Sequence, residues 1–271
     1  RSCQREHLLD FLAGSFFSLA GECFAARMVV EGSTTVLPIA QRAAEEYMNA
    51  HSEADISVRG GGSGVGITSL IEGTCDIASA SRAIKEDELQ KAAARGRAPK
   101  ANVIAMDGIA VIVNNANSVS ELSKKQLKDI FVGKITDWVQ VGGPSGRIVV
   151  VSRDSASGTF EAFGELALDK AKVRKDALMQ SSNQAVASVV SKTPGAIGYV
   201  GLAYLNGVKA LKIDGVKPSK ETVLSKQYKL SRPLFMYTNG KPAGLAREYL
   251  DFIQSPAGQK LVEEEGCVSI R

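Results

Sequence analysis

The stretch MVVEGSTTVLP, residues 28–38, decides the fold. Its apolar run at 28–30 predicts a β-strand, and the small, hydroxylated residues at 32–35 predict a tight turn. The pattern from residue 36 to about 50 predicts a helix, and Pro38 fits its first turn, where the missing N–H breaks no hydrogen bond. A strand that leads through such a turn into a helix is the repeating unit of α/β folds.

The same order recurs along the chain. Further strands are predicted at 56–58, 77–80, 104–113 (one long strand, broken only by Asp107 and Gly108), 148–152, 197–200 and 234–237. Further helices are predicted at 67–72, 86–95, 127–131, 155–168, 185–191, 243–255 and 256–265. This alternation predicts sheets flanked by helices.

Two apolar strands, near 109–113 and 234–237, are candidate crossings between two lobes. A chain of 271 residues is long enough for two such lobes, each with a core of its own. The first lobe is predicted to comprise residues 27–109 together with 232–271. The second is predicted to comprise residues 110–231.

Three strand-to-helix turns share one composition, at residues 32–35, 60–64 and 152–159. A helix N-terminus leaves backbone N–H groups unpaired and carries a partial positive charge, so it attracts anions. Taken singly, each turn is explained as a helix cap or a tight turn, and Arg153 as half of a surface salt bridge. Three such turns in one chain, one of them with an arginine that can grip a phosphate edge, favour an anion site.

The composition weighs against several other functions. The net charge of +4 is small and evenly spread, which argues against nucleic-acid binding. The only histidines are His7 and His51, so no metal cluster is apparent and Ser157 has no convincing general base. The glycine loop at 60–66 lacks the Lys-Ser/Thr ending of a nucleotide-binding loop. We therefore predict a binding protein, not an enzyme, without cofactor or metal.

Residues 1–26 have the layout of a secretory signal peptide, with Arg1 and Arg5 before an apolar core and small residues at 25–26. The alternative is an amphipathic N-terminal helix. A lipid anchor is not predicted, because Glu22 stands where that pattern needs a small residue. The expected location is the periplasm or the cell surface. Of the remaining cysteines, Cys75 and Cys267, two separate buried thiols are favoured over a disulfide.

Seven segments of this sequence, taken in order, resemble the phosphate-binding subunits of bacterial phosphate ABC transporters. They are residues 29–38, 60–66, 76–82, 130–138 (IFVGKITDW), 153–159, 195–201 (GAIGYVG) and 231–234. The resemblance extends over about residues 28–271. It implies a two-lobed periplasmic-binding-protein fold of type II, in which each lobe is a mixed sheet flanked by helices and two crossover strands form the hinge. It also implies inorganic phosphate as the ligand, a membrane permease as the partner, and a monomer.

The resemblance further implies where phosphate is held. The implied ligand residues of the first lobe are Ser33, Thr34, Thr35 and Ser63. Those of the second lobe are Arg153, Ser157, Gly158 and Thr159. Asn183 is a further candidate polar contact.

Two departures from the family pattern put the choice of anion in doubt. Better-known members have aspartates where this chain has Ser81 and Ser155, and such a carboxylate accepts the proton of phosphate while repelling sulfate. Ser81, Arg82 and Asp154 are assigned to the site here. Asp154 is interpreted either as the replacement acceptor or as a cap or partner of Arg153, and Arg82 as a second ligand cation or a surface charge. Sulfate or molybdate binding, and less plausibly hydrolysis of phosphate esters, stay open as alternatives.

Overall fold

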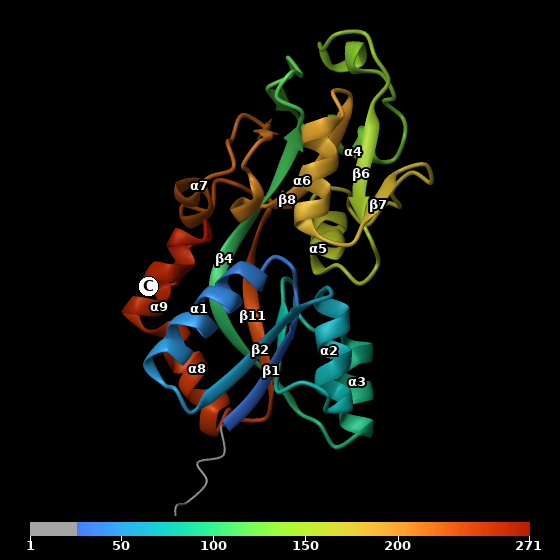
Figure 1. Cartoon of the computed structure of the whole chain (residues 1–271). Helices are drawn as coiled ribbons and strands as arrows, with labels where there is room; N and C mark the ends of the chain where they lie inside the picture. Colours follow the sequence, from blue (N-terminus) through green and yellow to red (C-terminus); the bar gives the residue numbers. More distant parts are fainter. Residues whose placement is uncertain (1–25) are drawn as a thin grey trace, which may run out of the picture.

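The computed structural model describes residues 26–271, and they form two lobes stacked end to end (Figure 1). The predicted signal peptide, residues 1–26, lies outside the described residues except for Ala26, where the first strand begins. Each lobe is a mixed sheet with helices packed on it, as the sequence predicts.

The first lobe is built around three parallel strands. They are β1 (Ala26–Gly32), β2 (Ala54–Gly60) and β3 (Ile77–Ala80), with β1 in the middle. Its helices are α1 (Leu37–Ala50), α2 (Ser63–Glu72), α3 (Glu86–Ala94), α8 (Gly244–Gln254) and α9 (Pro256–Glu264). Pro38 lies in the first turn of α1, where no intrahelical N–H bond is lost.

The second lobe repeats this plan. Its main strands are β6 (Val149–Arg153), β7 (Leu178–Gln180) and β8 (Ala196–Gly201), with β6 parallel to both neighbours. Its helices are α4 (Lys124–Phe131), α5 (Gly158–Leu166), α6 (Asn183–Lys192) and α7 (Lys220–Leu224). The short elements are β5 (Glu121–Leu122), β9 (Lys209–Ala210), β10 (Lys212–Ile213) and the 3₁₀ turns η1 (Trp138–Val141) and η2 (Leu202–Tyr204).

Two long strands, β4 (Pro99–Val113) and β11 (Ser231–Asn239), connect the lobes (Figure 1). They pair antiparallel in the first lobe as far as Ser231 opposite Gly108. From Ile109 onward β4 pairs with β8 of the second lobe. The prediction of one long strand through residues 104–113 is confirmed, because Asp107 and Gly108, which interrupt its apolar pattern, are both paired across to β11.

Each lobe has its own hydrophobic core. The second lobe packs an aromatic cluster in which the rings of Phe163 and Tyr199 stack with their centres 3.9 Å apart and Phe131 meets Phe163 edge-on. Buried residues of α1, α8 and the surrounding strands form a separate core in the first lobe. The two lobes therefore have separate cores, and several residues where the lobes meet are polar, among them Thr35 and Thr159.

Cys75 and Cys267 are both buried and unbonded, which confirms the prediction of two separate thiols. Burial raises the pKa of Cys75 to about 12, so this thiol is protonated at neutral pH. Within residues 26–271, none of the helices combines the length and the apolar character needed to cross a bilayer.

Candidate functional site

Four helices begin where the lobes meet: α1 and α2 of the first lobe, α5 and α6 of the second. The hydroxyls of Ser157 and Ser182 cap α5 and α6 by accepting backbone N–H bonds. Gly62 precedes α2 with φ of +99°, and a side chain there would collide with the backbone of Ala156. This close approach lets Gly64 N donate to Ala156 O across the interface at 3.0 Å.

The predicted serines and threonines of both lobes meet at this interface. The hydroxyl oxygens of Thr35 and Thr159 lie 3.0 Å apart, and those of Ser63 and Ser81 lie 3.4 Å apart. Gly158 packs against Ser63 so tightly that no side chain fits there. Each of these side chains is buried. We call the following set the hydroxyl cluster: Ser33, Thr34, Thr35, Ser63, Ser81, Ser157 and Thr159.

Most oxygens of the hydroxyl cluster already accept an N–H bond from the protein. Backbone N–H groups donate to three of them, at 3.0 to 3.2 Å: Ser33, Ser63 and Ser157. Side-chain nitrogens donate to three more: Thr34, Thr35 and Thr159. A hydroxyl has one proton and two lone pairs, so an oxygen that accepts from the protein keeps its proton to give to another acceptor. The cluster is therefore organised as a set of neutral donors.

Asn183 connects the lobes. It is fully buried at the start of α6, and its Nδ2 donates to Thr34 Oγ1 at 3.2 Å and to Thr35 Oγ1 at 3.0 Å. Its Oδ1 accepts from Gly201 N at 3.3 Å. Asn183, a further candidate from the sequence, thus contacts both threonines. Its amide orients their hydroxyls by donating to both oxygens.

Arg153 is only 1% exposed and is held by backbone carbonyls. Its Nε donates to Gln180 O at 3.1 Å and its Nη2 to Ser181 O at 3.0 Å. Its Nη1 is buried and has no hydrogen-bond partner among residues 26–271. Burial lowers the pKa of Arg153, but a guanidinium starts so high that it stays charged. A buried cation is unfavourable unless it is paired, and a buried donor is unfavourable unless it is hydrogen-bonded, so this position favours a bound anion.

Asp154, next to Arg153, has a local role. Its Oδ1 accepts from Ala156 N at 3.0 Å and shapes the turn before α5. Within the part of the chain that the structure describes, no carboxylate oxygen lies within 4.0 Å of an Arg153 nitrogen. Of the two interpretations of Asp154, the geometry favours the cap of a turn. Ser155, the other departure from the family pattern, is exposed.

A second buried arginine, Arg232, lies in the last of the segments that resemble the family, residues 231–234. It faces Asp107 directly across the strand pair β4–β11, and Nη2 lies 3.1 Å from Oδ2. Arg232 Nη1 also donates to Ser81 O at 3.0 Å and to Gly158 O at 3.3 Å, one in each lobe. The available signal was Asp107 itself, a charge within an otherwise apolar strand, since such a charge needs a buried partner.

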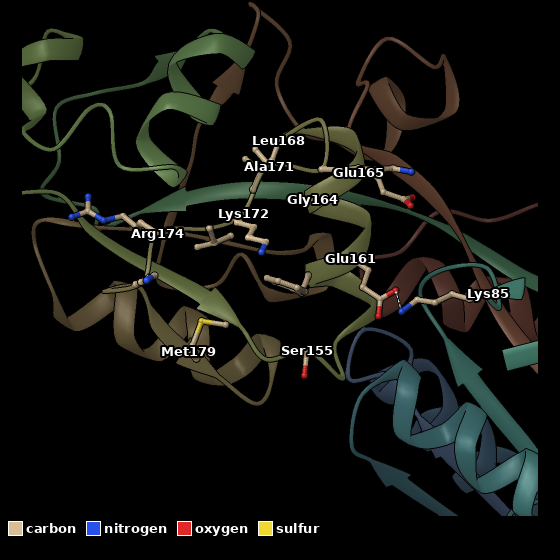
Figure 2. A pocket seen from close by; sticks show the side chains of 14 residues that line it. Lys85, Ser155, Glu161, Gly164, Glu165, Leu168, Ala171, Lys172, Arg174 and Met179 are labelled. Atoms are coloured by element: carbon tan, nitrogen blue, oxygen red, sulfur yellow. Dashed lines mark ion pairs between the residues drawn. The ribbon is translucent and has the colours of Figure 1, made fainter. Parts of the chain in front are cut away.

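Arg82, assigned to the site from the sequence, lies in ion pairs instead. Its two terminal nitrogens donate to Glu88 at 2.8 and 2.7 Å, and its Nε lies 2.8 Å from Glu161 Oε2. Lys85 Nζ lies 2.9 Å from the same oxygen of Glu161. Figure 2 marks this ion pair with a dashed line. Glu161 belongs to the second lobe and the other three to the first, so we call these four residues the interlobe clasp.

A groove of about 650 Å³ lies beside the clasp, over α5 (Figure 2). Its walls include Phe160, Leu168, Met179 and several lysines. It contains no member of the hydroxyl cluster and is far larger than a small inorganic anion needs, so the candidate site is the buried cluster and not this groove.

The buried charges of the site do not cancel. Arg153 and Arg232 supply two positive charges, and Asp107 supplies the one negative charge buried with them. Among residues 26–271, no group of acidic, histidine or cysteine side chains is arranged to hold a metal ion. Surplus positive charge, neutral hydroxyl donors and helix N-termini are the features that favour a small, highly charged anion, so this interface is the candidate site.

Two lobes on crossing strands, with polar groups converging between them, define a class of binding proteins. A family model for the PBP superfamily domain matches residues 21–257. The match covers most of the chain and fits the two-lobed architecture.

Similar proteins of known name identify the family within this superfamily. A phosphate-binding protein PstS from Bacillus subtilis is 37% identical over 249 residues, which is 90% of this chain and 80% of that protein. Another from Borreliella burgdorferi is 32% identical over 255 residues, or 89% of both chains. The chain therefore belongs to the PstS family of phosphate-binding proteins within the PBP superfamily.

Solved structures agree with this assignment. A putative phosphate ABC transporter substrate-binding protein from Clostridium perfringens, with bound phosphate, superimposes with a TM-score of 0.84 at 34% identity. The match covers 91% of this chain and 100% of that one. An ABC-type phosphate transport receptor from Vibrio cholerae gives a TM-score of 0.73 at 33% identity over 89% and 99% of the two chains.

Proposed function

We propose that this protein captures inorganic phosphate between its lobes and delivers it to the permease of an ABC transporter. Two observations carry the proposal: buried hydroxyls of both lobes meet at the interface, and Arg153 Nη1 is buried without a hydrogen-bond partner among residues 26–271. The names of the relatives from Bacillus and Clostridium point to the same ligand. Phosphate offers four oxygens and a high charge, which suits many neutral donors and one guanidinium.

The proposed ligand residues come from both lobes. They are Ser33, Thr34, Thr35 and Ser63 of the first lobe, and Arg153, Ser157, Gly158 and Thr159 of the second. Ser81 lies next to this set, because its hydroxyl and its backbone N–H both contact the hydroxyl of Ser63. Arg82 and Asp154 are left out, because their polar atoms are engaged in the clasp and in a turn. We place the lobe boundaries at residues 27–109 with 232–271, and 110–231.

Capture follows from the division of the donors. In an open arrangement each lobe presents its donors to water, and phosphate meets one lobe first. Closure brings in the donors of the other lobe, which replace the remaining hydration shell, so the ligand favours the closed state by its extra contacts there. Closure around ligands by hinge motion is typical of periplasmic binding proteins. Scavenging requires a dissociation constant of about 1 μM or tighter, which corresponds to about −8 kcal/mol.

The proposal also covers the permease partner, the oligomeric state and the location of the protein in the cell. Closure joins the lobes at the clasp, and we expect a permease to contact both lobes there and so to distinguish loaded from empty protein. A secreted monomer in the periplasm or on the cell surface fits this role. Fractionation of cells that express the full chain tests the location, and recovery in the cytosolic fraction would contradict it.

Calorimetric titration tests the ligand. Protein that has been unfolded, stripped of ligand and refolded is titrated with phosphate, then with sulfate and molybdate. Tight one-to-one binding of phosphate is expected. No heat with phosphate would overturn the proposed function.

One alternative has a specific observation in its favour. Serine stands at positions 81 and 155, where aspartates of better-known members would repel a fully deprotonated oxyanion. Equal affinity for sulfate in the same titration would make this a general tetrahedral-oxyanion binder. Turnover of a chromogenic phosphate ester by the same sample would instead point to a hydrolase.

A further inference from the structure

The turn that carries Ser33, Thr34 and Thr35 has one backbone group without its usual partner. The backbone already turns as a helix there, since Leu37 N donates to Ser33 O at 3.0 Å. In an α-helix each carbonyl accepts from the N–H four residues later, so the carbonyl of Thr34 would accept from residue 38. Residue 38 is a proline, which has no N–H. The turn therefore leaves Thr34 O in need of a donor from another part of the molecule.

Tyr204 of the second lobe supplies that donor. It lies at the end of η2 and packs against the core of the second lobe, and its hydroxyl donates to Thr34 O at 2.5 Å. Burial raises the pKa of Tyr204, so the hydroxyl keeps the proton that it donates. A bond between residues 170 positions apart therefore replaces the local bond that Pro38 prevents.

The Tyr204 bond differs from the other link between this turn and the second lobe. Asn183 donates to the hydroxyl oxygens of Thr34 and Thr35, which belong to the hydroxyl cluster. Tyr204 instead uses a main-chain carbonyl oxygen, which is an acceptor only and cannot bind an anion. The bond therefore fixes the turn to the second lobe without using a group that could donate to phosphate.

We propose that Tyr204 is a positioning residue of the phosphate site, which holds the turn of Ser33, Thr34 and Thr35 against the second lobe when the lobes close. This inference rests on the proposed function and deepens it, since it adds a residue that acts on the ligand only through the turn. The bond joins the two lobes, so it forms on closure and is lost when they separate. It stabilises the closed, phosphate-bound state relative to the open state and should slow the release of phosphate.

The test is Tyr204→Phe, which keeps the ring and removes the hydroxyl. Phosphate binding should weaken about 5-fold, as expected for the loss of one hydrogen bond whose acceptor is exposed to water in the open state. The change should appear in the dissociation rate measured by stopped flow, and the unfolding free energy of ligand-free protein in urea should stay close to that of wild type. Wild-type affinity in Tyr204→Phe would overturn this inference and leave the proposed function intact. Absence of phosphate binding by the wild-type protein would overturn both.

Tyr249→Phe is the matched control. The hydroxyl of Tyr249 donates to Ala40 O of α1 at 2.7 Å, so it also binds a main-chain carbonyl, but both of these residues belong to the first lobe. This variant should lose unfolding free energy and bind phosphate as wild type does. Equal weakening of phosphate binding in the two variants would contradict a role that depends on the second lobe.

Pro38→Ala separates the link between the lobes from the need of Thr34 O for any donor. Alanine fits the first turn of α1 and restores the N–H at residue 38, which can donate to Thr34 O within the first lobe. Combined with Tyr204→Phe, it supplies the carbonyl with a donor but does not link the turn to the second lobe, so phosphate release should remain fast. Recovery of the wild-type release rate in this double variant would contradict the inference.

Discussion

Arg153 and Arg232 are two buried guanidiniums at one site, yet their surroundings differ in charge. Arg232 sits on the crossing strands with Asp107 opposite it at 3.1 Å, so this region is neutral. Arg153 sits at the end of β6, where two backbone carbonyls hold it. Each of the two arginines has one buried nitrogen without a hydrogen-bond partner among residues 26–271, Nη1 of Arg153 and Nε of Arg232, so they differ in the carboxylate and not in the unused donor. The difference teaches that burial alone does not decide whether an arginine has charge to offer an anion: among the described residues, Arg153 has no carboxylate within ion-pair distance and Arg232 has one.

Arg82 extends the comparison to a third environment. Its charge is matched by Glu88 and Glu161 at the edge of the interface, and it joins the lobes there. Of these three arginines in the described chain, only Arg153 lacks a carboxylate within ion-pair distance. The predictions below test this assignment.

The largest expected effect is on folding. Arg232→Met leaves the Asp107 carboxylate buried and unpaired, which should lower the free energy of unfolding by about 3–5 kcal/mol. Arg153→Met leaves no carboxylate behind and should cost much less. Urea unfolding of ligand-free protein measures both, and equal losses for the two variants would remove the distinction between the two regions.

The next effect is on binding. Arg153→Ala should weaken phosphate binding by about 2 kcal/mol, close to 30-fold, because the anion loses a charge-assisted bond in a buried site. Calorimetry gives the dissociation constant. Arg147→Ala is the matched control, since Arg147 is exposed and its one ion pair within residues 26–271 is with Asp176, and it should bind as wild type does. An unchanged constant for Arg153→Ala would refute the proposed site.

A smaller effect is expected at the clasp. Glu161→Gln removes the carboxylate that Arg82 and Lys85 share across the interface, and the loss of this half-buried pairing should weaken phosphate binding by about 1 kcal/mol. The change should appear as faster dissociation, measured by stopped flow. Glu165→Gln, one turn further along α5 and exposed, should dissociate at the wild-type rate. Similar rates for all three proteins would exclude a role of the clasp in closure.

The smallest effect depends on pH. Burial alone would raise the pKa of Glu88, but hydrogen bonds from Arg82 and from the Lys85 backbone hold it below its ordinary value of about 4.3. A lowered pKa means stability that is present above the ordinary value and lost as pH falls through the lower, folded value. The difference in unfolding free energy between wild type and Glu88→Gln should therefore shrink on acidification. A difference that grows with acid would contradict this sign.

Much of the fold follows from local signals. The turn at residues 32–35 and the alternation of strands and helices predict the α/β lobes, because caps, turn residues and periodicity act over a few neighbours. Short pieces such as β5, β9 and β10 were missed, since two-residue strands have no periodicity to detect. The partner of the charge at Asp107 was also missed, because cross-strand pairing is not local.

The candidate site, like the fold, could be predicted from the sequence only in part. Composition and the family resemblance single out Ser33–Thr35, Ser63 and 157–159, and the structure brings most of them together. The resemblance also selected Arg153, whose unused donor appears only in three dimensions. Asp107 was interpreted only as an interruption of an apolar strand, and its partner Arg232 was not predicted. Arg82 was assigned to the ligand, whereas in the structure it forms ion pairs in the clasp.

The sequence by itself determined where the helices begin, and therefore which hydroxyls and N–H groups can face an anion. Only the tertiary structure decided which charges are available to that anion. Asp107 and Arg232 are 125 residues apart in the chain and neutralise each other only because their strands pair. Coulomb interactions depend on distance and burial, so they become definite only when folding brings the groups together.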